Sequence, residues 1–357
     1  MEKFSFGVEP VTCHAWNGNR SQIAISPNNH EVHIYSKKGS GWEKTFTMKE
    51  HTQRVTSIDW AAESNRIVTC GTDRNAYVWV LNDKGEWRPT LVILRINRAA
   101  TCVKWSPRED KFAVGSGARL ISICYFESEN DWWVSKHIKK PIRSTVTCLD
   151  WHPNNVLLAC GSTDFKVRVF SAYVKEIEAQ KPESTPWGKK MSFGVLMSEV
   201  TTSGGWVHDV SFSSDGNRLA WVCHNSTINV VNAAADSLVT TTRTPYLPFL
   251  CCTWISPNAL IVAGHDCELM RYSVDANGAI TFVKKISVAS KKAAGKVSAM
   301  AMFQKMDKHA TTNEEKGKSS THQNSITQLS IHTGKKDSVS KLSSTGVDGQ
   351  LVIWNIS

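Results

Sequence analysis

Residues 146–172 read "VTCLDWHPNNVLLACGSTDFKVRVFSA", and this pattern decides the fold because it recurs along the chain. It contains three short segments, 146–151, 156–163 and 166–172, that are rich in β-branched, aromatic and small apolar residues. Such runs, separated by clusters of Asn, Asp, Gly and Pro, indicate β-strands. Because the segments are almost continuously apolar, they predict sheets that are covered on both faces. The chain is therefore expected to be all-β.

The first of these three segments recurs at a regular interval. Its counterparts are "VTCHAW" (11–16), "VTSIDW" (55–60), "ATCVKW" (100–105), "VHDVSF" (207–212) and "FLCCTW" (249–254). The aromatic residues that end the six segments lie at positions 16, 60, 105, 151, 212 and 254, so the period is nearly constant except for one longer step before Phe212. Self-similarity at such a period indicates one supersecondary unit repeated along the chain. A radial array of four-stranded blades, each sandwiched between its neighbours, satisfies both the period and the two-sided burial.

Two segments compete to open the last unit, one starting at Val297 and the other at Ile326. In the second unit, Val55 opens the first segment and Trp79 lies near the end of the third. The interval from Ile326 to Trp354 is similar to this one, whereas the interval from Val297 to Trp354 is more than twice as long. The sequence therefore predicts a seven-bladed β-propeller in which Ile326 opens the seventh blade.

A single propeller over residues 1–357, with two insertions, accounts for the rest of the chain. The seventh blade is one strand short, so we expect residues 3–9, approximately, to supply its outer strand and leave no open edge. Residues 174–206 explain the longer step before Phe212, and "GVLMSEV" in this insertion is expected to form the outer strand of the fourth blade. In the same insertion, Trp187 is either a plug in the rim or a contact residue. Residues 286–325 form the second insertion, between blades six and seven.

The second insertion contains a predicted protruding helix at about 299–309. Its composition switches to Ala, Met, Gln and Lys, which are good helix formers, and its flanks have the polar composition of linkers. The residues that share one helical stripe are Ala299, Met302, Phe303, Met306 and Ala310. This stripe either packs back onto the propeller rim or forms an exposed Met/Phe anchor for a partner, since methionine-rich faces suit adaptable binding.

The third segments of the units resemble those of WD-repeat propellers. Trp79, Phe170 and Trp354 occupy the position of that family's tryptophan, although the dipeptide Trp-Asp occurs nowhere in the chain. A short acidic side chain before such a segment can accept hydrogen bonds from the N–H groups of its own turn. We interpret these acids as structural, not catalytic: Asp73, Asp164, Asp266 and Asp348, with Asn29 and Asn225 at matching places. His51, which shortly precedes Val55, resembles the family's buried structural histidine.

Composition and charge narrow the classes of function. The net charge of +10 favours acidic partners such as nucleic acid, anionic lipid or an acidic protein surface. Basic pairs such as Lys139 and Lys140 fall in predicted loops of different blades, so we do not expect them to converge on one face. No segment has the pattern of a signal peptide or the length of a membrane span.

No motif predicts catalysis, a metal or a cofactor. Zinc-protease, nucleophile-elbow and phosphate-loop patterns are missing from the sequence. The ten cysteines show no CxxC pair, and most lie in apolar strand-like segments, which is typical of buried thiols in a reducing compartment. We therefore expect a non-enzymatic, cytoplasmic protein.

Four stretches carry a closer resemblance: 12–35, 90–146, 149–176 and 322–331. They are similar to the WD-repeat subunit (subunit 1) of the actin-related protein 2/3 complex, which nucleates branched actin filaments. The similarity runs from about residue 4 to the end of the chain. It is most specific in the unusual block 127–133, "ESENDWW".

The resemblance implies a non-catalytic scaffold of the actin cytoskeleton. The implied partners are actin-related protein 2, the small subunits 4 and 5, the actin filament and nucleation-promoting factors. Residues 300–308 match the family's protruding helix, which is associated with the mother filament and with the activators. The implied partner-binding residues are Met300, Met302, Phe303 and Met306 for apolar contacts, and Lys305 and Lys308 for electrostatic ones.

Other classes of function remain as alternatives. A generic WD-repeat interaction protein or an RNA-associated scaffold would fit the charge, but a nucleic-acid site needs cations converging on one face with aromatic side chains for stacking. A membrane-surface adaptor would need a long basic amphipathic helix, which the sequence lacks. We therefore expect neither nucleic acid nor a membrane span among the partners.

Overall fold

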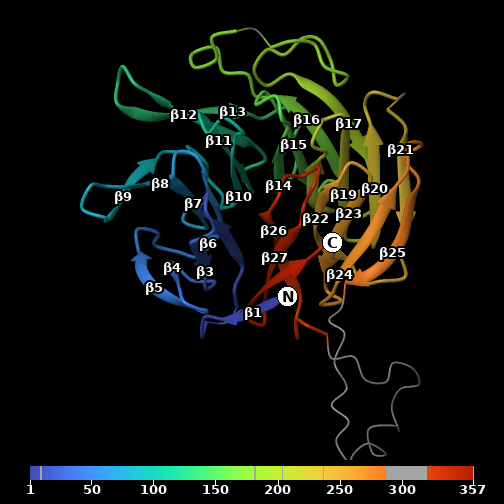
Figure 1. The fold of residues 1–357 in the computed structure, drawn as a ribbon. Helices are drawn as coiled ribbons and strands as arrows, with labels where there is room; N and C mark the ends of the chain where they lie inside the picture. Colours follow the sequence, from blue (N-terminus) through green and yellow to red (C-terminus); the bar gives the residue numbers. More distant parts are fainter. Residues whose placement is uncertain (9, 181, 203, 236, 287–319, 357) are drawn as a thin grey trace, which may run out of the picture.

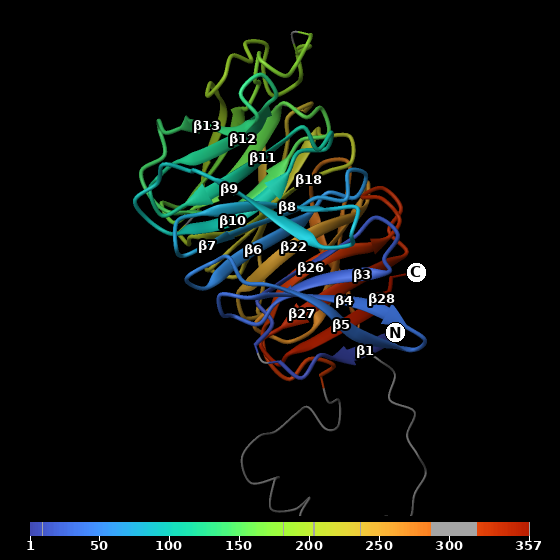
Figure 2. The ribbon, with the colours of Figure 1, turned by 90° about the vertical axis from the view of Figure 1, so that its left-hand side faces the viewer.

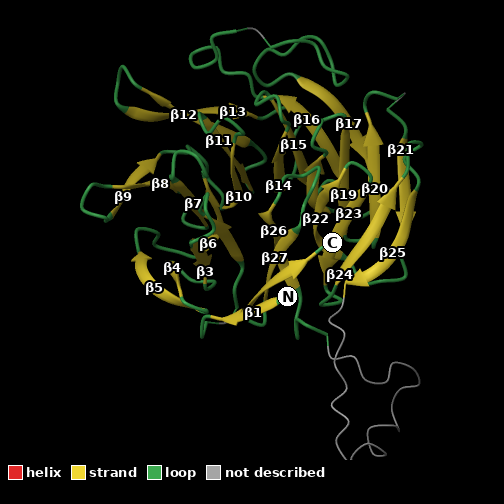
Figure 3. Cartoon of the chain, viewed as in Figure 1, coloured by secondary structure: helices red, strands yellow, loops and turns green. Residues whose placement is uncertain are grey.

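The computed structural model describes residues 1–356 except 9, 181, 203, 236 and 287–319. The described chain forms seven four-stranded antiparallel sheets arranged as blades around a central channel (Figure 1). Figure 3 shows that this part of the chain consists of strands and loops, with no helix. The prediction of an all-β, seven-bladed propeller is confirmed. The predicted helix at 299–309 lies outside the described residues.

The blades are numbered by their inner strands, which face the channel: β2 (Cys13–Trp16), β6 (Val55–Trp60), β10 (Ala100–Trp105), β14 (Val146–Trp151), β18 (Val207–Phe212), β22 (Phe249–Ser256) and β26 (Ile326–Thr333). The second strands are β3 (Gln22–Ser26), β7 (Ile67–Gly71), β11 (Lys111–Ser116), β15 (Leu157–Ser162), β19 (Arg218–Cys223), β23 (Ala259–Gly264) and β27 (Lys341–Gly346).

The third strands are β4 (Val32–Lys38), β8 (Ala76–Leu81), β12 (Ile121–Glu127), β16 (Lys166–Ser171), β20 (Thr227–Asn232), β24 (Leu269–Val274) and β28 (Gln350–Asn355). The outer strands are β5 (Gly41–Met48), β9 (Trp87–Val92), β13 (Trp132–Ile138), β17 (Leu196–Thr201), β21 (Val239–Arg243), β25 (Ile280–Ile286) and, in blade 7, β1 (Glu2–Ser5).

Hydrogen bonds between neighbouring inner strands join the blades. A threonine at the second position of an inner segment donates its hydroxyl to a backbone carbonyl of the next blade. Thr56 reaches Ala100 at 2.9 Å, and Thr101 reaches Val146 at 2.6 Å. Similar bonds run from Thr147 to Val207 at 2.6 Å and from Thr327 to Val11 at 3.1 Å. The recurring threonine of the sequence repeat therefore joins the blades as well as belonging to a strand.

Strand β1 is the outer strand of blade 7, so this sheet is built from both ends of the chain (Figure 2). It pairs antiparallel with β28, with Phe4 opposite Leu351. The ring of Phe4 also lies 6.1 Å from that of Trp42 in blade 1, in an edge-to-face arrangement. The strand is shorter than the 3–9 expected from sequence, and it begins at Glu2. It thus covers the edge of the seventh sheet and packs against the first.

The first insertion is anchored to the rim of the ring. Trp187 is buried against Phe212, and its indole N–H donates to the carbonyl of Gly216 at 2.8 Å. Glu178 is also buried and forms an ion pair of 2.7 Å with Lys111, which links the insertion to blade 3. Of the two roles considered for Trp187, the structure therefore shows the rim plug.

Blade 2 contains a buried series of hydrogen bonds that links its turns to its strands. His51 Nδ1 lies 2.9 Å from the Asp73 carboxylate, and Nε2 lies 2.9 Å from the hydroxyl of Thr69. The indole N–H of Trp79 donates to the same hydroxyl at 3.0 Å. A carboxylate can only accept, so Nδ1 carries the proton. These hydrogen bonds fix the connection before β6 against the turn between β7 and β8.

Blade 7 repeats this arrangement with different residues. His322 Nδ1 lies 3.0 Å from Asp348, and Nε2 lies 2.8 Å from the hydroxyl of Ser344, which accepts the indole N–H of Trp354 at 2.7 Å. Sequence reasoning missed His322. The signal was present, because His322 stands before Ile326 at the same spacing as His51 before the residue that opens blade 2.

The acids of blades 4 and 6 have other partners. Asp164 pairs with the buried guanidinium of Arg168 at 2.8 Å, and Ile142 stands four residues before Val146, where blade 2 has His51. Asp266 accepts the N–H of Leu247, from the connection that leads into blade 6, at 2.9 Å. Asp73, by contrast, accepts an N–H of its own turn, that of Asn75, at 3.1 Å. The four acids therefore share a position but not a set of partners.

We predict that Asp348→Asn lowers the free energy of unfolding at neutral pH by about 1–3 kcal/mol, because His322 and the Gln323 N–H lose a charged acceptor. Burial alone would raise the pKa of Asp348, but these hydrogen bonds hold it below its ordinary value. The stabilisation is therefore complete above the unfolded-state pKa of about 4 and is lost as the pH falls through the lower folded-state pKa.

Urea unfolding at neutral and strongly acidic pH measures this difference. The exposed Asp337→Asn serves as the control and should leave the free energy of unfolding unchanged. A variant as stable as the parent at neutral pH, or a deficit that does not shrink in acid, would contradict the role assigned to Asp348.

Deleting residues 1–5 should lower the free energy of unfolding by about 2 kcal/mol or more, because the β1–β28 ladder and the half-buried Phe4 are lost. It should also increase aggregation, since β28 becomes an open edge. Urea unfolding and light scattering measure the two effects, with Ser5→Ala as the control that keeps the strand. Unchanged stability and scattering would show that β1 does not support the ring.

Candidate interaction site

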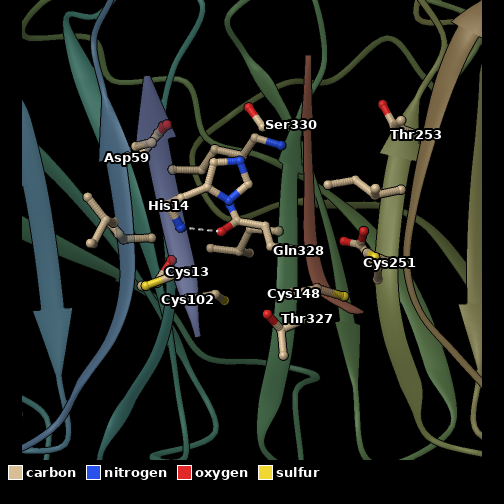
Figure 4. Close-up of a pocket in the computed structure, with 18 of the residues that line it drawn as sticks. Cys13, His14, Asp59, Cys102, Cys148, Cys251, Thr253, Thr327, Gln328 and Ser330 are labelled. Atoms are coloured by element: carbon tan, nitrogen blue, oxygen red, sulfur yellow. Dashed lines mark hydrogen bonds between the residues drawn. The ribbon is translucent and has the colours of Figure 1, made fainter. Parts of the chain in front are cut away.

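The central channel is the first place to look for a site, and Figure 4 shows part of its wall. It encloses about 460 Å³ and is lined by inner strands of several blades, with Cys13, Cys102, Cys148 and Cys251 among the lining residues. The N–H of His14 donates to the side-chain oxygen of Gln328 at 2.6 Å, which joins blade 1 to blade 7.

Two thiols and one histidine of the channel wall are held in their neutral forms by burial. Burial raises the pKa of the Cys13 thiol to about 12 and that of Cys102 to about 11, so neither supplies the thiolate that a nucleophile or metal ligand requires. The ring of His14 is hydrogen-bonded to the hydroxyls of Thr345 and Ser343, at 2.9 and 2.8 Å, and burial lowers its pKa to about 3. Among the residues that the structure describes, no three His, Cys, Asp or Glu side chains gather to hold a metal.

Charged groups in the channel pair with one another across the ring. Lys104 of blade 3 and Lys336 of blade 7 each lie 2.7 Å from the carboxylate of Asp150 in blade 4. Burial alone would raise the pKa of Asp150, but the two ammonium groups lower it to about 2. Asp150 also accepts the N–H of Phe212 in blade 5 at 2.7 Å. This cluster joins four blades, and the carboxylate of Asp150 is fully engaged by its ion pairs and hydrogen bond.

The rim of the ring offers exposed apolar side chains instead. They are distributed over several blades: Val80, Leu81, Leu91 and Ile93 at blade 2, Phe126 and Trp132 at blade 3, and Phe282 and Val283 at blade 6. Trp132 is 58% exposed and Ile93 is 64% exposed, which is unusual for such large apolar groups. Sequence reasoning reached only Trp132, through the block 127–133. Whether a strand residue faces a neighbouring blade or the solvent depends on the ring and not on local sequence.

The six partner-binding residues expected in the second insertion all lie outside the described residues: Met300, Met302, Phe303, Lys305, Met306 and Lys308. The described chain on either side belongs to a blade. Strand β25 ends at Ile286 as the outer strand of blade 6, and His322 is fully buried where the chain enters blade 7. The insertion is therefore attached to two neighbouring blades.

Comparison with known proteins identifies the repeats. The family described as "WD domain, G-beta repeat" matches residues 42–80 and 135–171. These two stretches contain Trp79 of β8 and Phe170 of β16, the third strands of blades 2 and 4. Among the described residues, no helix is long and apolar enough to cross a membrane.

Full-length relatives are similar over almost the whole chain. Actin-related protein 2/3 complex subunit 1A-B of Xenopus laevis is 60% identical over 99% of this chain and 96% of its own length. Subunit 1B-A of the same organism is 57% identical over 100% and 96%. Subunit 1 of Schizosaccharomyces pombe is 40% identical over 98% and 97%. The chain therefore belongs to the family of actin-related protein 2/3 complex subunit 1.

Proposed function

We propose that the chain is the non-catalytic scaffold subunit of an actin-related protein 2/3 complex and supports the nucleation of branched actin filaments. The observation that carries this proposal is the 60% identity to subunit 1A-B, which extends over 99% of the chain. The closed ring supports it as well, because seven blades fixed to one another offer a rigid surface for several partners at once.

The scaffold needs contact surfaces, and the rim supplies candidates. The outer strands and rim loops expose large apolar groups at different blades, among them Ile93 and Trp132. Such groups can anchor protein partners. We assign this rim to sister subunits, with actin-related protein 2 and the small subunits 4 and 5 as the partners that the family resemblance implies. The proposed location is the cytoplasmic actin cytoskeleton.

The second insertion is proposed to contact the mother filament and nucleation-promoting factors. Its apolar contacts are assigned to Met302, Phe303 and Met306, and its electrostatic contacts to Lys305 and Lys308, because actin and the activators' tail segments are acidic. Its attachment at Ile286 and at the buried His322 supports this proposal, since both ends start from a rigid blade.

Purification of the tagged chain from cell extract tests the scaffold. It should recover actin-related proteins 2 and 3 together with the small subunits in equal amounts, as mass spectrometry of the eluate would show. Recovery of ribonucleoprotein without these subunits would reject the scaffold and favour an RNA-associated propeller.

Changing Met302, Phe303 and Met306 together to Ser tests the insertion. We expect normal folding and complex assembly but at least about tenfold fewer branches per filament, because three apolar contacts are removed from a partner groove. Branches are counted by fluorescence microscopy of actin polymerised with the assembled complex.

The matched control replaces exposed apolar residues elsewhere, Leu238→Ser with Leu247→Ser, and should leave branching near the parent level. A second variant, Lys305→Ala with Lys308→Ala, separates the electrostatic from the apolar contribution by its salt dependence. If the triple variant fails to fold, its stripe belongs to the propeller rim and the assignment to an external partner is wrong.

A further inference from the structure

Six cationic side chains converge at blade 3 from three connections that are separate in sequence. The connections are 93–99 between β9 and β10, the turn 117–120 between β11 and β12, and 139–145 between β13 and β14. Because strands alternate in direction within a blade, these three connections lie on the same face of the ring. Their exposed cations are Arg95, Arg98, Arg119, Lys139, Lys140 and Arg143. One of the basic pairs noted in the sequence, Lys139 and Lys140, belongs to this cluster, and the other four cations are single arginines.

Four of these six cations line a pocket whose wall contains no carboxylate. The pocket has a volume of about 570 Å³, and Arg95, Arg119, Lys139 and Lys140 contribute to its wall. No Asp or Glu and no aromatic residue is among the lining residues. Among the ion pairs of the described residues, none involves any of the six cations, although other exposed cations such as Lys38 do pair with acids.

The backbone around the pocket is fixed, so the connections that carry the cations are held near one another. The N–H of Gly117 donates to the carbonyl of Ala99 at 2.9 Å, which joins the first two connections. His137 hydrogen-bonds the carbonyl of Leu94 at 2.8 Å, which ties β13 to the 93–99 connection. Cations gathered in this way repel one another unless an anion binds between them. The arrangement therefore favours an anionic ligand.

The chemistry of the wall selects the kind of anion. Guanidinium groups match phosphate oxygens with two parallel hydrogen bonds, and lysine adds a compact charge. The volume lies in the range of small-molecule sites. Nucleic-acid binding is disfavoured, because no aromatic ring of the pocket can stack on a base.

We propose that this pocket binds a ligand bearing several phosphate groups, either a soluble inositol polyphosphate or the headgroup of a phosphoinositide. Such a site is a function additional to the scaffold role, and it does not depend on the second insertion.

Calorimetric titration of the full chain with inositol hexakisphosphate tests the pocket. The variant Arg119→Gln with Lys140→Gln should bind at least about tenfold more weakly, because two charge-assisted contacts are lost. The matched control Arg243→Gln with Lys284→Gln removes one exposed arginine and one exposed lysine from other blades. This control variant should bind the probe with an affinity within about twofold of that of the parent chain, because only the long-range electrostatic attraction changes.

Co-sedimentation with vesicles separates the two sources of phosphate. One set contains phosphatidylinositol bisphosphate, and the other contains phosphatidylserine at equal total charge. Preference for the first set, lost in the Arg119/Lys140 variant, supports the site and identifies a lipid headgroup. Tight binding of the soluble probe without preference between the vesicles supports the site and identifies a soluble ligand.

Three results would overturn the proposal. They are no binding in either experiment, equal weakening in the control variant, and tighter binding of a single-stranded RNA oligomer than of the inositol probe. Thermal unfolding of each variant shows that the fold is retained. Arg119→Lys keeps the charge but loses the planar fork, so it should weaken binding less than the double variant.

Discussion

The structure depends on the burial of each blade between two neighbours. Strands β15 and β23 are buried along their whole length, which is possible only if apolar side chains on both sheet faces are covered. The apolar clusters accordingly combine residues of adjacent blades, as where Met48 of blade 1 packs with Trp60 and Trp79 of blade 2. A blade without a neighbour would expose one face of its sheet to water, so the ring has to close.

Closure of the ring determines which side chains join the blades and which are available to bind partners. The polar groups of the inner strands bond to one another, as Thr101 does to Val146 and Lys104 to Asp150, and Lys336 of the β26–β27 turn also pairs with Asp150. The channel is therefore part of the scaffold. The outer strands and the connections do not line the channel. The exposed Ile93 and Trp132 and the cations of blade 3 lie on these outer elements. Because the polar groups of the inner strands are used to join the blades, the side chains available to bind partners lie on the outer surface of the ring.

Sequence reasoning was most reliable where the signal was local and repeated. Comparing intervals to Trp354 assigned the opening of the last blade to Ile326, and β26 begins at that residue. It was least reliable for the hydrogen-bond and ion-pair partners of the turn acids. The hydrogen bond of Asp348 to His322 was not predicted, nor was the ion pair of Asp164 with Arg168. Such pairings depend on two connections meeting in space, which a strand pattern does not encode.

The sequence by itself determined the strand pattern, the repeat and the number of blades, because periodic burial and turn chemistry act over a few residues. Family membership also follows from sequence similarity. Only the tertiary structure decided which distant groups meet. Asp150 and Lys336 are far apart in the chain and form an ion pair across the channel. Arg95, Arg119 and Lys140 come from three connections and share one pocket. Both outcomes arise because the ring closes and its blades are held in fixed positions.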